Sequence, residues 1–254
     1  MKVISVTGIT GGVGATTLVA QLAFALRARG SRVIAFDFSP HNMLRLHFGM
    51  PWAEGGGLVP YILSDKPWHE SAYRCENMIE FLPFGKCNEH EIAAFYRMQH
   101  KNPSWLAERL AELHTDEDTY VLIDSPRSGH DLRAQAHALS NLILIALEAD
   151  TQAYAVLEQA QTSLSLADAE KAVLLLNAYD PTRKLDCDIA KLLLHTHQAN
   201  LCPVTIHRDE FVREALASKR SLREYAPYSQ AASNFTTLTT WLIARCANVP
   251  PALK

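Results

Sequence analysis

The chain has 254 residues, of which 48% are hydrophobic and 20% charged, enough for the large buried core of an ordinary globular domain. Its 24 Lys and Arg residues nearly balance 27 Asp and Glu residues, and the formal charge of −3 argues against a strongly basic nucleic-acid binder and against an acidic disordered chain. The longest apolar stretch, Leu142 to Leu147, is far shorter than the roughly 20 residues that span a bilayer, and the N-terminus does not read as a signal peptide. These features predict a cytoplasmic protein.

Short apolar runs recur along the chain and are separated by helical or turn-rich segments. Runs without polar alternation are typical of strands covered on both faces, as in a parallel sheet between two layers of helices. The predicted strands are Val3 to Val6, Val33 to Phe36, Tyr120 to Ile123, Leu142 to Leu147, Val173 to Leu176 and Val204 to Ile206, with a weaker seventh at Ile79 to Phe84.

The intervals between these runs carry helical periodicity. Leu18, Leu22 and Leu26 lie on one stripe of a helix that Gly30 can terminate. Similar patterns predict helices over 103–114, 130–140, 152–166, 185–197, 209–218 and 229–246. This alternation predicts an α/β fold, in which residues 1–254 form a single doubly wound domain with a mostly parallel sheet and helices on both faces. The least regular stretch, 49–102, is expected to be an insertion over the sheet edge.

A glycine-rich segment, Thr7 to Thr17, joins the first predicted strand to the first predicted helix. Backbone N–H groups in such a turn converge on an anion, and the helix dipole favours negative charge there. A Rossmann dinucleotide turn would need a glycine at the position of Thr17. Thr16 and Thr17 after Gly14 fit better with a phosphate-binding loop in which Thr16 holds Mg²⁺. A glycine-rich turn without a ligand is the remaining alternative.

Two predicted strands are followed directly by an aspartate, Asp37 and Asp124. Such positions lie at the carboxyl edge of the sheet, where α/β folds bind ligands. An isolated aspartate there often only caps a helix. Two of them after a phosphate-binding loop are better explained as ligands of Mg²⁺, directly or through water, and they are also the candidates for catalytic residues.

The phosphate-binding loop lacks its usual cation. The position after Gly14, where such loops carry a lysine that reaches the outer phosphates, is Ala15, and no lysine occurs between Lys2 and Lys66. Loss of that charge-assisted contact is expected to cost roughly ten- to a hundredfold in nucleotide affinity. Catalysis is expected to suffer more, because positive charge on the transferred phosphoryl group supplies much of the rate.

Taken in order, these segments resemble the MinD/ParA family of deviant Walker ATPases over nearly the whole chain. The matching segments are Thr10 to Thr17, Asp37 to Pro40, Asp124 to Pro126, Leu176-Asn177, Ile206 to Glu210, Glu214-Ala215 and Glu224 to Pro227. Within that superfamily the chain most resembles the BcsQ (YhjQ) family of cellulose biosynthesis proteins, through Leu44 to Leu46, Leu82 to Gly85 and Ile206 to Glu210.

The resemblance implies a role for each matching position, with ATP and Mg²⁺ as the cofactors. The residues that would bind the nucleotide are Thr10, Gly11, Gly12, Val13, Gly14, Ala15, Thr16, Thr17, Asn177, His207, Arg208 and Asp209, and those that would hold Mg²⁺ are Thr16, Asp37 and Asp124. Asn177 would read the adenine edge, and the turn from His207 to Asp209 would close over the base. Two subunits of this family sandwich two ATP molecules face to face, which implies a homodimer.

Three positions that take part in ATP hydrolysis in the MinD/ParA family carry other residues in this chain. Members of the family carry lysines at the positions of Thr10 and Ala15, and a carboxylate that helps to position water at that of Ser39. We therefore expect ATP hydrolysis to be slow or absent. The arginines that could neutralise the triphosphate instead are Arg45, Arg127 and Arg208. Arg127 is preferred because it lies three residues after Asp124.

Other clusters favour no further ligand. The cysteines, Cys75, Cys87, Cys187, Cys202 and Cys246, are widely spaced, which predicts reduced thiols rather than a zinc site, although spacing alone does not exclude a shared iron–sulfur cluster. The scattered histidines suggest no transition metal.

Basic residues between Arg208 and Arg223 alternate with acidic ones, which predicts a solvated face rather than a DNA-binding surface. A C-terminal helix carrying Phe235 and Leu242 is predicted to pack in the core rather than to bind or insert into membranes.

The leading functional hypothesis is a nucleotide-dependent dimer that recruits components of an inner-membrane cellulose synthase and secretion complex. The partners, namely BcsR, BcsE and synthase subunits, are implied by the resemblance alone. The alternative is an active ParA- or MinD-like ATPase that cycles between monomer and dimer to position DNA or another cargo. Phosphotransfer to a small metabolite, as in synthetase relatives of the fold, is disfavoured by the missing lysine.

Overall fold

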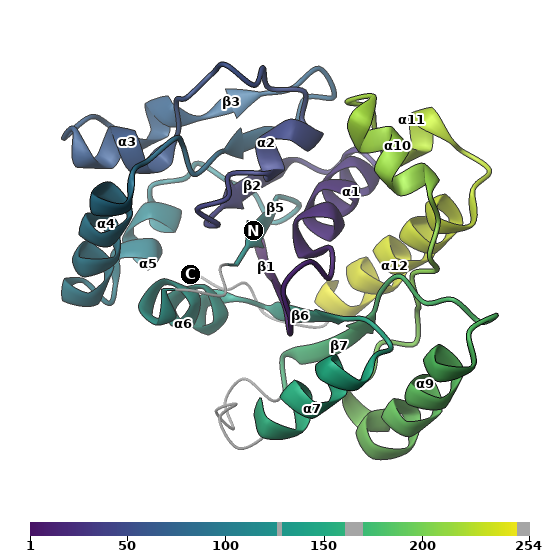
Figure 1. Ribbon diagram of the computed structural model, residues 1–254. Coiled ribbons are helices and arrows are strands. Elements are labelled where there is room, and N and C mark those ends of the chain that lie inside the picture. The colour runs from purple at the N-terminus through teal and green to yellow at the C-terminus, as the bar shows by residue number, and fades with distance from the viewer. Residues whose placement is uncertain (126–128, 161–169, 248–254) are drawn as a thin grey trace.

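The computed structural model describes residues 1–125, 129–160 and 170–247 (Figure 1). Within these ranges, seven strands form one sheet in the order β3-β4-β2-β5-β1-β6-β7. The strands are β1 (Lys2–Gly8), β2 (Val33–Asp37), β3 (Tyr73–Arg74), β4 (Glu80–Leu82), β5 (Tyr120–Asp124), β6 (Leu142–Leu147) and β7 (Ala172–Leu176). Every neighbouring pair is parallel except β3 and β4, which are antiparallel.

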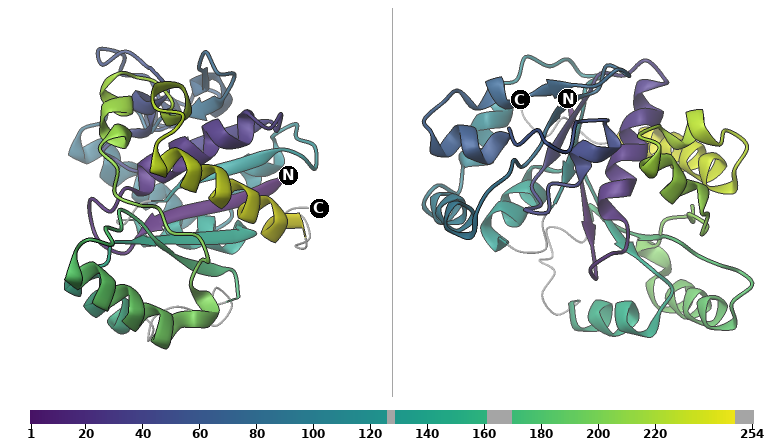
Figure 2. Two further views of the ribbon diagram at one scale, coloured as in Figure 1. Left: turned by 90° about the vertical axis from the view of Figure 1, so that its right-hand side faces the viewer. Right: turned by 45° about the horizontal axis from the view of Figure 1, so that its top comes forward.

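Helices cover both faces of this sheet (Figures 1 and 2). The α-helices are α1 (Ala15–Arg27), α2 (Leu44–His47), α3 (Leu58–Leu63), α4 (Glu89–Lys101), α5 (Trp105–Ala111), α6 (His130–Leu139), α7 (Thr151–Ala160), α9 (Lys184–His197), α10 (Phe211–Ala217), α11 (Leu222–Tyr225) and α12 (Gln230–Ala247), and the 3₁₀-helices are η1 (Trp68–Ser71) and η2 (Gln198–Asn200). The predicted α/β fold with a mostly parallel sheet between helical layers is confirmed.

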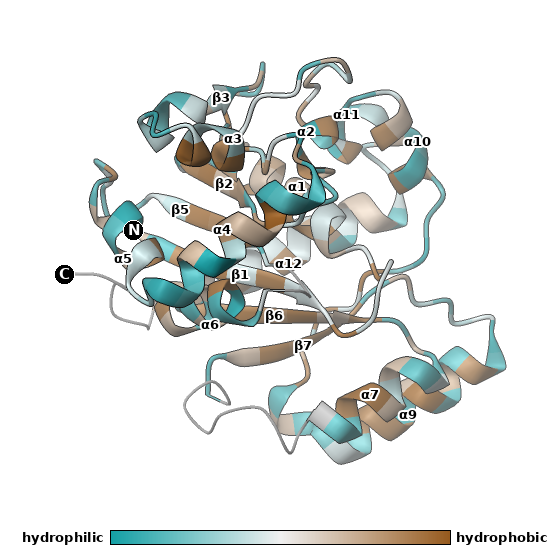
Figure 3. Ribbon diagram, turned by 60° about the vertical axis from the view of Figure 1, so that its left-hand side comes forward, coloured by the Kyte–Doolittle hydropathy of each residue, from teal (hydrophilic) through white to brown (hydrophobic). Residues whose placement is uncertain are grey.

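Alternate residues of the strands belong to different cores, because successive side chains of a strand point to opposite faces. Ile4 and Val6 of β1 pack with α1 and α12, whereas Val3 packs with α5 and α6. On this second face, α7 and α9 cover β6 and β7. The strands are correspondingly apolar between more polar outer helices (Figure 3). The double covering explains why the sequence shows unbroken apolar runs.

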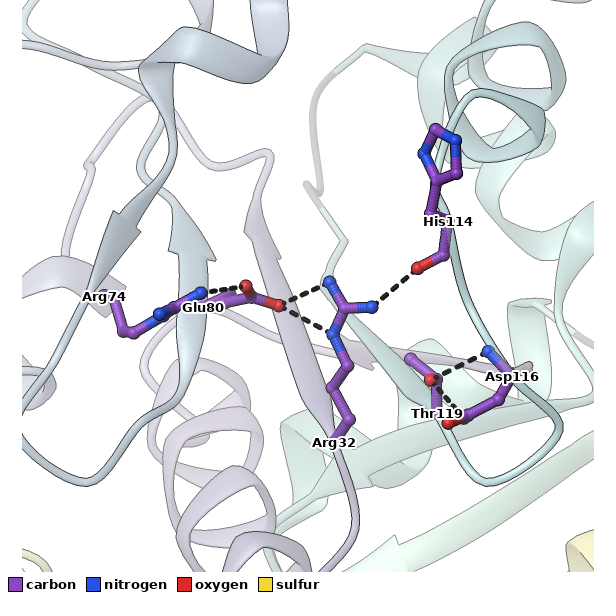
Figure 4. A network of polar contacts seen from close by, with 6 residues as sticks. All are labelled: Arg32, Arg74, Glu80, His114, Asp116 and Thr119. Carbon is purple, nitrogen blue, oxygen red and sulfur yellow. Dashed lines mark hydrogen bonds and ion pairs between the residues drawn. The ribbon is translucent and has the colours of Figure 1, made fainter.

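Residues 49–102 contribute α3, η1, β3, β4 and α4. β4 pairs with β2, and β3 forms the edge of the sheet beside it. Arg32, just before β2, binds the carboxylate of Glu80 on β4 and also donates to the backbone carbonyl of His114 at 2.6 Å (Figure 4). These contacts tie this region to the loop before β5.

The prediction of a strand at Val204 to Ile206 is wrong, because the structure has no strand there. Cys202 donates its backbone N–H to the carbonyl of Leu174, and Ile206 donates to that of Leu176, so two steps along β7 are matched by four along this segment. Pro203 also lacks an N–H donor. The segment therefore follows the edge of the sheet without keeping the register of a ladder, and isolated bridges flank it at Leu201 and His207.

Most predicted helices are confirmed, and their ends lie within three residues of the predicted ones where both are described. The predicted helix 152–166 corresponds to α7, and its residues beyond 160 lie outside the described ranges. α12 buries Phe235, Leu238 and Leu242, which confirms the predicted core helix. In the part of the chain that the structure describes, no helix is both long and apolar enough to cross a membrane.

Candidate functional site

The glycine-rich loop connects β1 to α1 at the carboxyl edge of the sheet (Figure 1). Gly14 precedes α1 with φ +85°, and a Cβ atom there would lie 2.7 Å from Nδ2 of Asn177. Both the left-handed conformation and the close approach therefore require glycine. The first N–H groups of α1 have no acceptor within the helix, which makes this end of α1 suited to an anion.

A pocket of about 350 Å³ opens beside this loop. The predicted nucleotide-binding residues that line it are Gly12, Val13, Gly14, Thr17, Asn177, His207, Arg208 and Asp209. Leu18, Ile206 and Phe235 add apolar surface that suits a flat ring. The fold thus brings together segments that lie up to about two hundred residues apart in sequence, as the resemblance implied.

The other predicted residues of the loop do not line this pocket. Thr10 is buried, Gly11 is exposed, and Ala15 packs partly against the core that contains α12. Thr16 points to the sheet instead, where its hydroxyl donates to Oδ2 of Asp124 at 2.6 Å. Neither position at which the family carries a lysine therefore presents a cation here.

The predicted magnesium residues are adjacent. Asp37 and Asp124 are register partners at the ends of β2 and β5, and they are 0% and 3% exposed. Oδ1 of Asp37 accepts from the N–H of Ser39 at 2.9 Å, and Oδ2 accepts from that of Leu44 at 3.1 Å. Ser39, at the position where the family carries a carboxylate, thus contributes its backbone to holding Asp37.

The charge of this pair is poorly compensated within the described protein. Burial raises the pKa of Asp124 to about 7 against the lowering effect of the Thr16 hydroxyl, and burial together with repulsion from Asp124 raises the pKa of Asp37. Two buried carboxylates beside a hydroxyl are hard oxygen ligands of the kind that Mg²⁺ prefers. The donor set therefore fits the predicted metal, which would relieve the repulsion.

Asn177, directly after β7, is bonded to the glycine-rich loop. Its Nδ2 donates to the carbonyl of Val13 at 2.7 Å, which fixes the loop against the end of β7. We expect Asn177→Ala to lower the free energy of unfolding by about 1–2 kcal/mol, because the Val13 carbonyl loses its partner. Chemical denaturation measures this, with Asn200→Ala at an exposed position as the matched control. Equal stabilities of the two variants would contradict this role.

The turn from His207 to Asp209 is anchored to neighbouring helices. The His207 N–H donates to Oδ1 of Asn234, while the Asp209 carboxylate accepts from the N–H groups of Phe211 and Ala231. Asp209 therefore acts here on the ends of α10 and α12. Its two oxygens position the turn that lines the pocket.

Glu148 is a pocket residue that sequence reasoning missed. Its carboxylate pairs with Arg208 across the pocket at 3.2 Å. Its position in the sequence could have indicated a site residue. Glu148 is the first polar residue after the apolar run that forms β6, and it therefore lies at the carboxyl edge of the sheet, where ligands bind. Arg208 thus lines the pocket as predicted, but with an acidic partner.

Arg45 has a different environment from the one expected of a phosphate ligand. It is 7% exposed, and its guanidinium donates to the backbone carbonyls of Asn42, Pro51 and Glu54, at 3.1, 3.1 and 2.7 Å, and lies over the ring of Trp52. It does not line the pocket beside the glycine-rich loop. Arg127, the preferred candidate, lies outside the described residues.

We expect Arg45→Met to lower the free energy of unfolding by about 2–4 kcal/mol, because several carbonyls lose a charged donor. Arg97→Met, at an exposed position, is the matched control. Thermal and chemical denaturation compare the two variants. A destabilisation no larger than that of the control would show that these contacts do not organise the segment.

Comparisons with known proteins identify the family and the fold of this chain. A family profile described as cellulose biosynthesis protein BcsQ matches residues 1–243. The chain is 30% identical over 251 residues to cellulose biosynthesis protein BcsQ of Salmonella typhi, which covers 96% of this chain and 94% of that protein. Its fold is similar to that of the septum site-determining protein MinD from Pyrococcus horikoshii, complexed with Mg-ADP, with a TM-score of 0.75 and 21% identity over 98% of this chain and 99% of that one. It is also similar to cobyrinic acid a,c-diamide synthase from Mycobacterium smegmatis, with bound ATP analogue and magnesium, with a TM-score of 0.71 and 20% identity over 99% of both chains.

Proposed function

The chain belongs to the BcsQ family of cellulose biosynthesis proteins, and we propose that it binds ATP with Mg²⁺ and acts as a nucleotide-dependent dimeric assembly factor in bacterial cellulose synthesis. The observation that carries the proposal is a group of adjacent oxygen ligands, in which Thr16 is bound to Asp124 at 2.6 Å and Asp37 lies beside it, next to a glycine-rich loop without cations. Similar folds that bind Mg-ADP or an ATP analogue support the choice of ligand.

In this proposal the residues of the chain divide the work of binding. The N–H groups at the start of α1 would hold the phosphates, and the pocket between Asn177 and Phe235 would receive the base. Thr16, Asp37 and Asp124 would hold Mg²⁺, directly or through water. When bound, the metal would supply positive charge at the phosphates.

Slow hydrolysis is the proposed consequence of the missing cations. Ala15 offers only a methyl group, Thr10 is buried, and Ser39 has no carboxylate with which to position water. Stabilisation of charge on the transferred phosphoryl group is the main source of rate in such sites. Binding, which depends mostly on backbone donors, would be affected less than catalysis.

The dimer and its partners are the remaining part of the proposal. Two chains would face each other across bound nucleotide, and the outer face of the dimer would recruit components of the cellulose synthase and secretion complex. Family membership supports this role in cellulose synthesis. BcsR, BcsE and synthase subunits are the proposed contacts.

Light scattering with ATP, with ADP and without nucleotide tests the proposal. We expect a dimer with Mg·ATP and a monomer without nucleotide, with phosphate release close to background over an hour. Thr16→Ala should weaken the Mg²⁺-dependent dimer. A monomer under all conditions would contradict the proposal, while rapid phosphate release stimulated by DNA or liposomes would favour the alternative of a cycling ATPase.

A further inference from the structure

A second pocket, of about 420 Å³, lies apart from the nucleotide site, and the two share no lining residue. It is lined by residues 47–51 and 73–77 together with Phe24, Glu54, Phe81 and Lys219. These belong to α1, to the end of α2 and the loop after it, to the β3–β4 hairpin, and to the turn after α10, which lie near one another in Figure 1. We propose that this pocket binds an uncharged, planar heteroaromatic small molecule and that its occupancy is coupled to the magnesium site.

Aromatic side chains form a continuous series along the pocket. The ring centroids of Phe24 and Phe48 are 5.5 Å apart, those of Phe48 and Phe81 are 5.0 Å apart, and Tyr73 stacks on Phe81 at 5.8 Å. Phe24, Phe48 and Phe81 are each less than 10% exposed. Because these rings already cover much of one another, a flat ring in the pocket would gain apolar burial and edge contacts with them.

His47 supplies one polar group inside this aromatic pocket. Its side chain is 5% exposed, lines the pocket and has no hydrogen-bond or ion-pair partner among the described residues. Burial lowers the pKa of His47 to about 4, so the imidazole is neutral at pH 7 and offers one donor and one acceptor nitrogen. A ligand with a complementary ring N–H or acceptor nitrogen can therefore pair with this imidazole inside the pocket.

The charged side chains that line the pocket are exposed and do not favour one sign. Arg74 is already paired with Glu80, which also binds Arg32 (Figure 4). Glu54 accepts from the N–H of Gly56, and both Glu54 and Glu76 are exposed. Lys219, also exposed, is the lysine among the residues that line the pocket. The class of ligand therefore depends on the aromatic rings and the neutral imidazole inside the pocket, and these favour an uncharged heteroaromatic ring.

A direct backbone connection runs from this pocket to the magnesium site. The N–H of Leu44, the first residue of α2, donates to Oδ2 of Asp37, and His47 is the last residue of the same helix. The Arg45 guanidinium binds carbonyls from Asn42 to Glu54, which joins α2 and the pocket-lining loop into one unit. A shift of Asp37 on binding Mg²⁺ would therefore move His47. This coupling rests on the proposed function, whereas the pocket itself does not.

Cysteine protection tests the pocket in the nucleotide-free chain. Cys75 lines it, whereas Cys87 and Cys187 are partly exposed elsewhere and serve as internal controls. We expect saturating indole to slow the alkylation of Cys75 by N-ethylmaleimide at least threefold, measured by peptide mass spectrometry, without slowing the two controls. No protection of Cys75, or equal protection of all three thiols, would overturn the proposal.

The imidazole contact is tested with a matched pair of probes. Benzothiophene has the size of indole but lacks its N–H donor, so it should need roughly three- to tenfold higher concentration to protect Cys75. In His47→Phe the two probes should protect Cys75 equally. Equal protection by both probes in the unmodified chain would overturn the assigned role of His47 whether or not the variant folds.

Coupling is tested by repeating the indole titration with Mg·ATP. We expect the half-protecting concentration of indole to change at least threefold, and by reciprocity indole should change the affinity for Mg·ATP by the same factor. Nucleotide binding with no change in indole protection would overturn the coupling alone. Failure of Mg·ATP to bind would overturn the proposed function and the coupling, and the cysteine-protection result would still decide the pocket.

Discussion

Ala15→Lys is expected to raise the affinity for Mg·ATP roughly ten- to a hundredfold, because it restores a charge-assisted contact to the phosphates. Ala15 is the first residue of α1 and is only partly buried, so a flexible side chain can begin there without filling the core. Turnover should rise by a larger factor, since a cation acts mainly on charge that develops during phosphoryl transfer. Calorimetric titration and phosphate-release assays measure the two effects.

Ala15→Met is the matched control for this variant, because methionine adds an unbranched side chain without charge. Thermal denaturation of both variants separates a loss of folding from a change in the site. The prediction requires the lysine variant alone to gain affinity and turnover. If the lysine and methionine variants behave alike, the missing cation does not limit this site.

Asp124→Asn is expected to stabilise the nucleotide-free protein at pH 8 by about 2–4 kcal/mol, although it removes a site residue. The pKa of Asp124 is raised to about 7 from an ordinary value of 3.8, so folding favours its protonated form. The stabilising contribution of that form is full below about pH 4 and is lost as the pH rises through 7. Asparagine avoids the buried charge and can still accept a hydrogen bond from the Thr16 hydroxyl.

The same variant should lose the tighter nucleotide binding that Mg²⁺ provides, because the amide is a poorer ligand for the metal than a carboxylate. Denaturation at pH 5 and pH 8 gives the stability difference, and titrations with and without Mg²⁺ give the binding effect. Asp188→Asn, at an exposed position on α9, is the control. A variant less stable than the control at pH 8, with unchanged Mg²⁺ dependence, would contradict the magnesium assignment.

Much of the fold follows from local pattern. The apolar runs around Ile4, Val121 and Leu144 predict strands because both of their faces are buried. The segment from Val204 to Ile206 is also mostly apolar, but it does not form a strand, because Pro203 lacks a donor and because the segment does not keep the register of β7. Periodicity thus predicts which segments are apolar on both faces, and tertiary pairing decides which of them become strands.

Some residues of the candidate site could likewise be predicted from the sequence, and others could not. Asp37 and Asp124 were predictable because each ends an apolar run that forms a strand, and the sheet brings the ends of these strands together. Arg45 and Glu148 were not, since the environment of a long charged side chain depends on which carbonyls or cations the fold places nearby. The pocket around His47 likewise combines segments distant in sequence, and none of them carries a recognisable motif alone.

Calorimetric titration of the chain with ATP, in the presence and absence of Mg²⁺, tests the central claim most directly. We expect saturable binding of one ATP per chain that tightens with Mg²⁺, despite the absence of lysine from the glycine-rich loop. We also expect that the tightening disappears in Thr16→Ala, which removes the hydroxyl that contacts Asp124. No saturable binding of Mg·ATP to a folded chain would contradict the account.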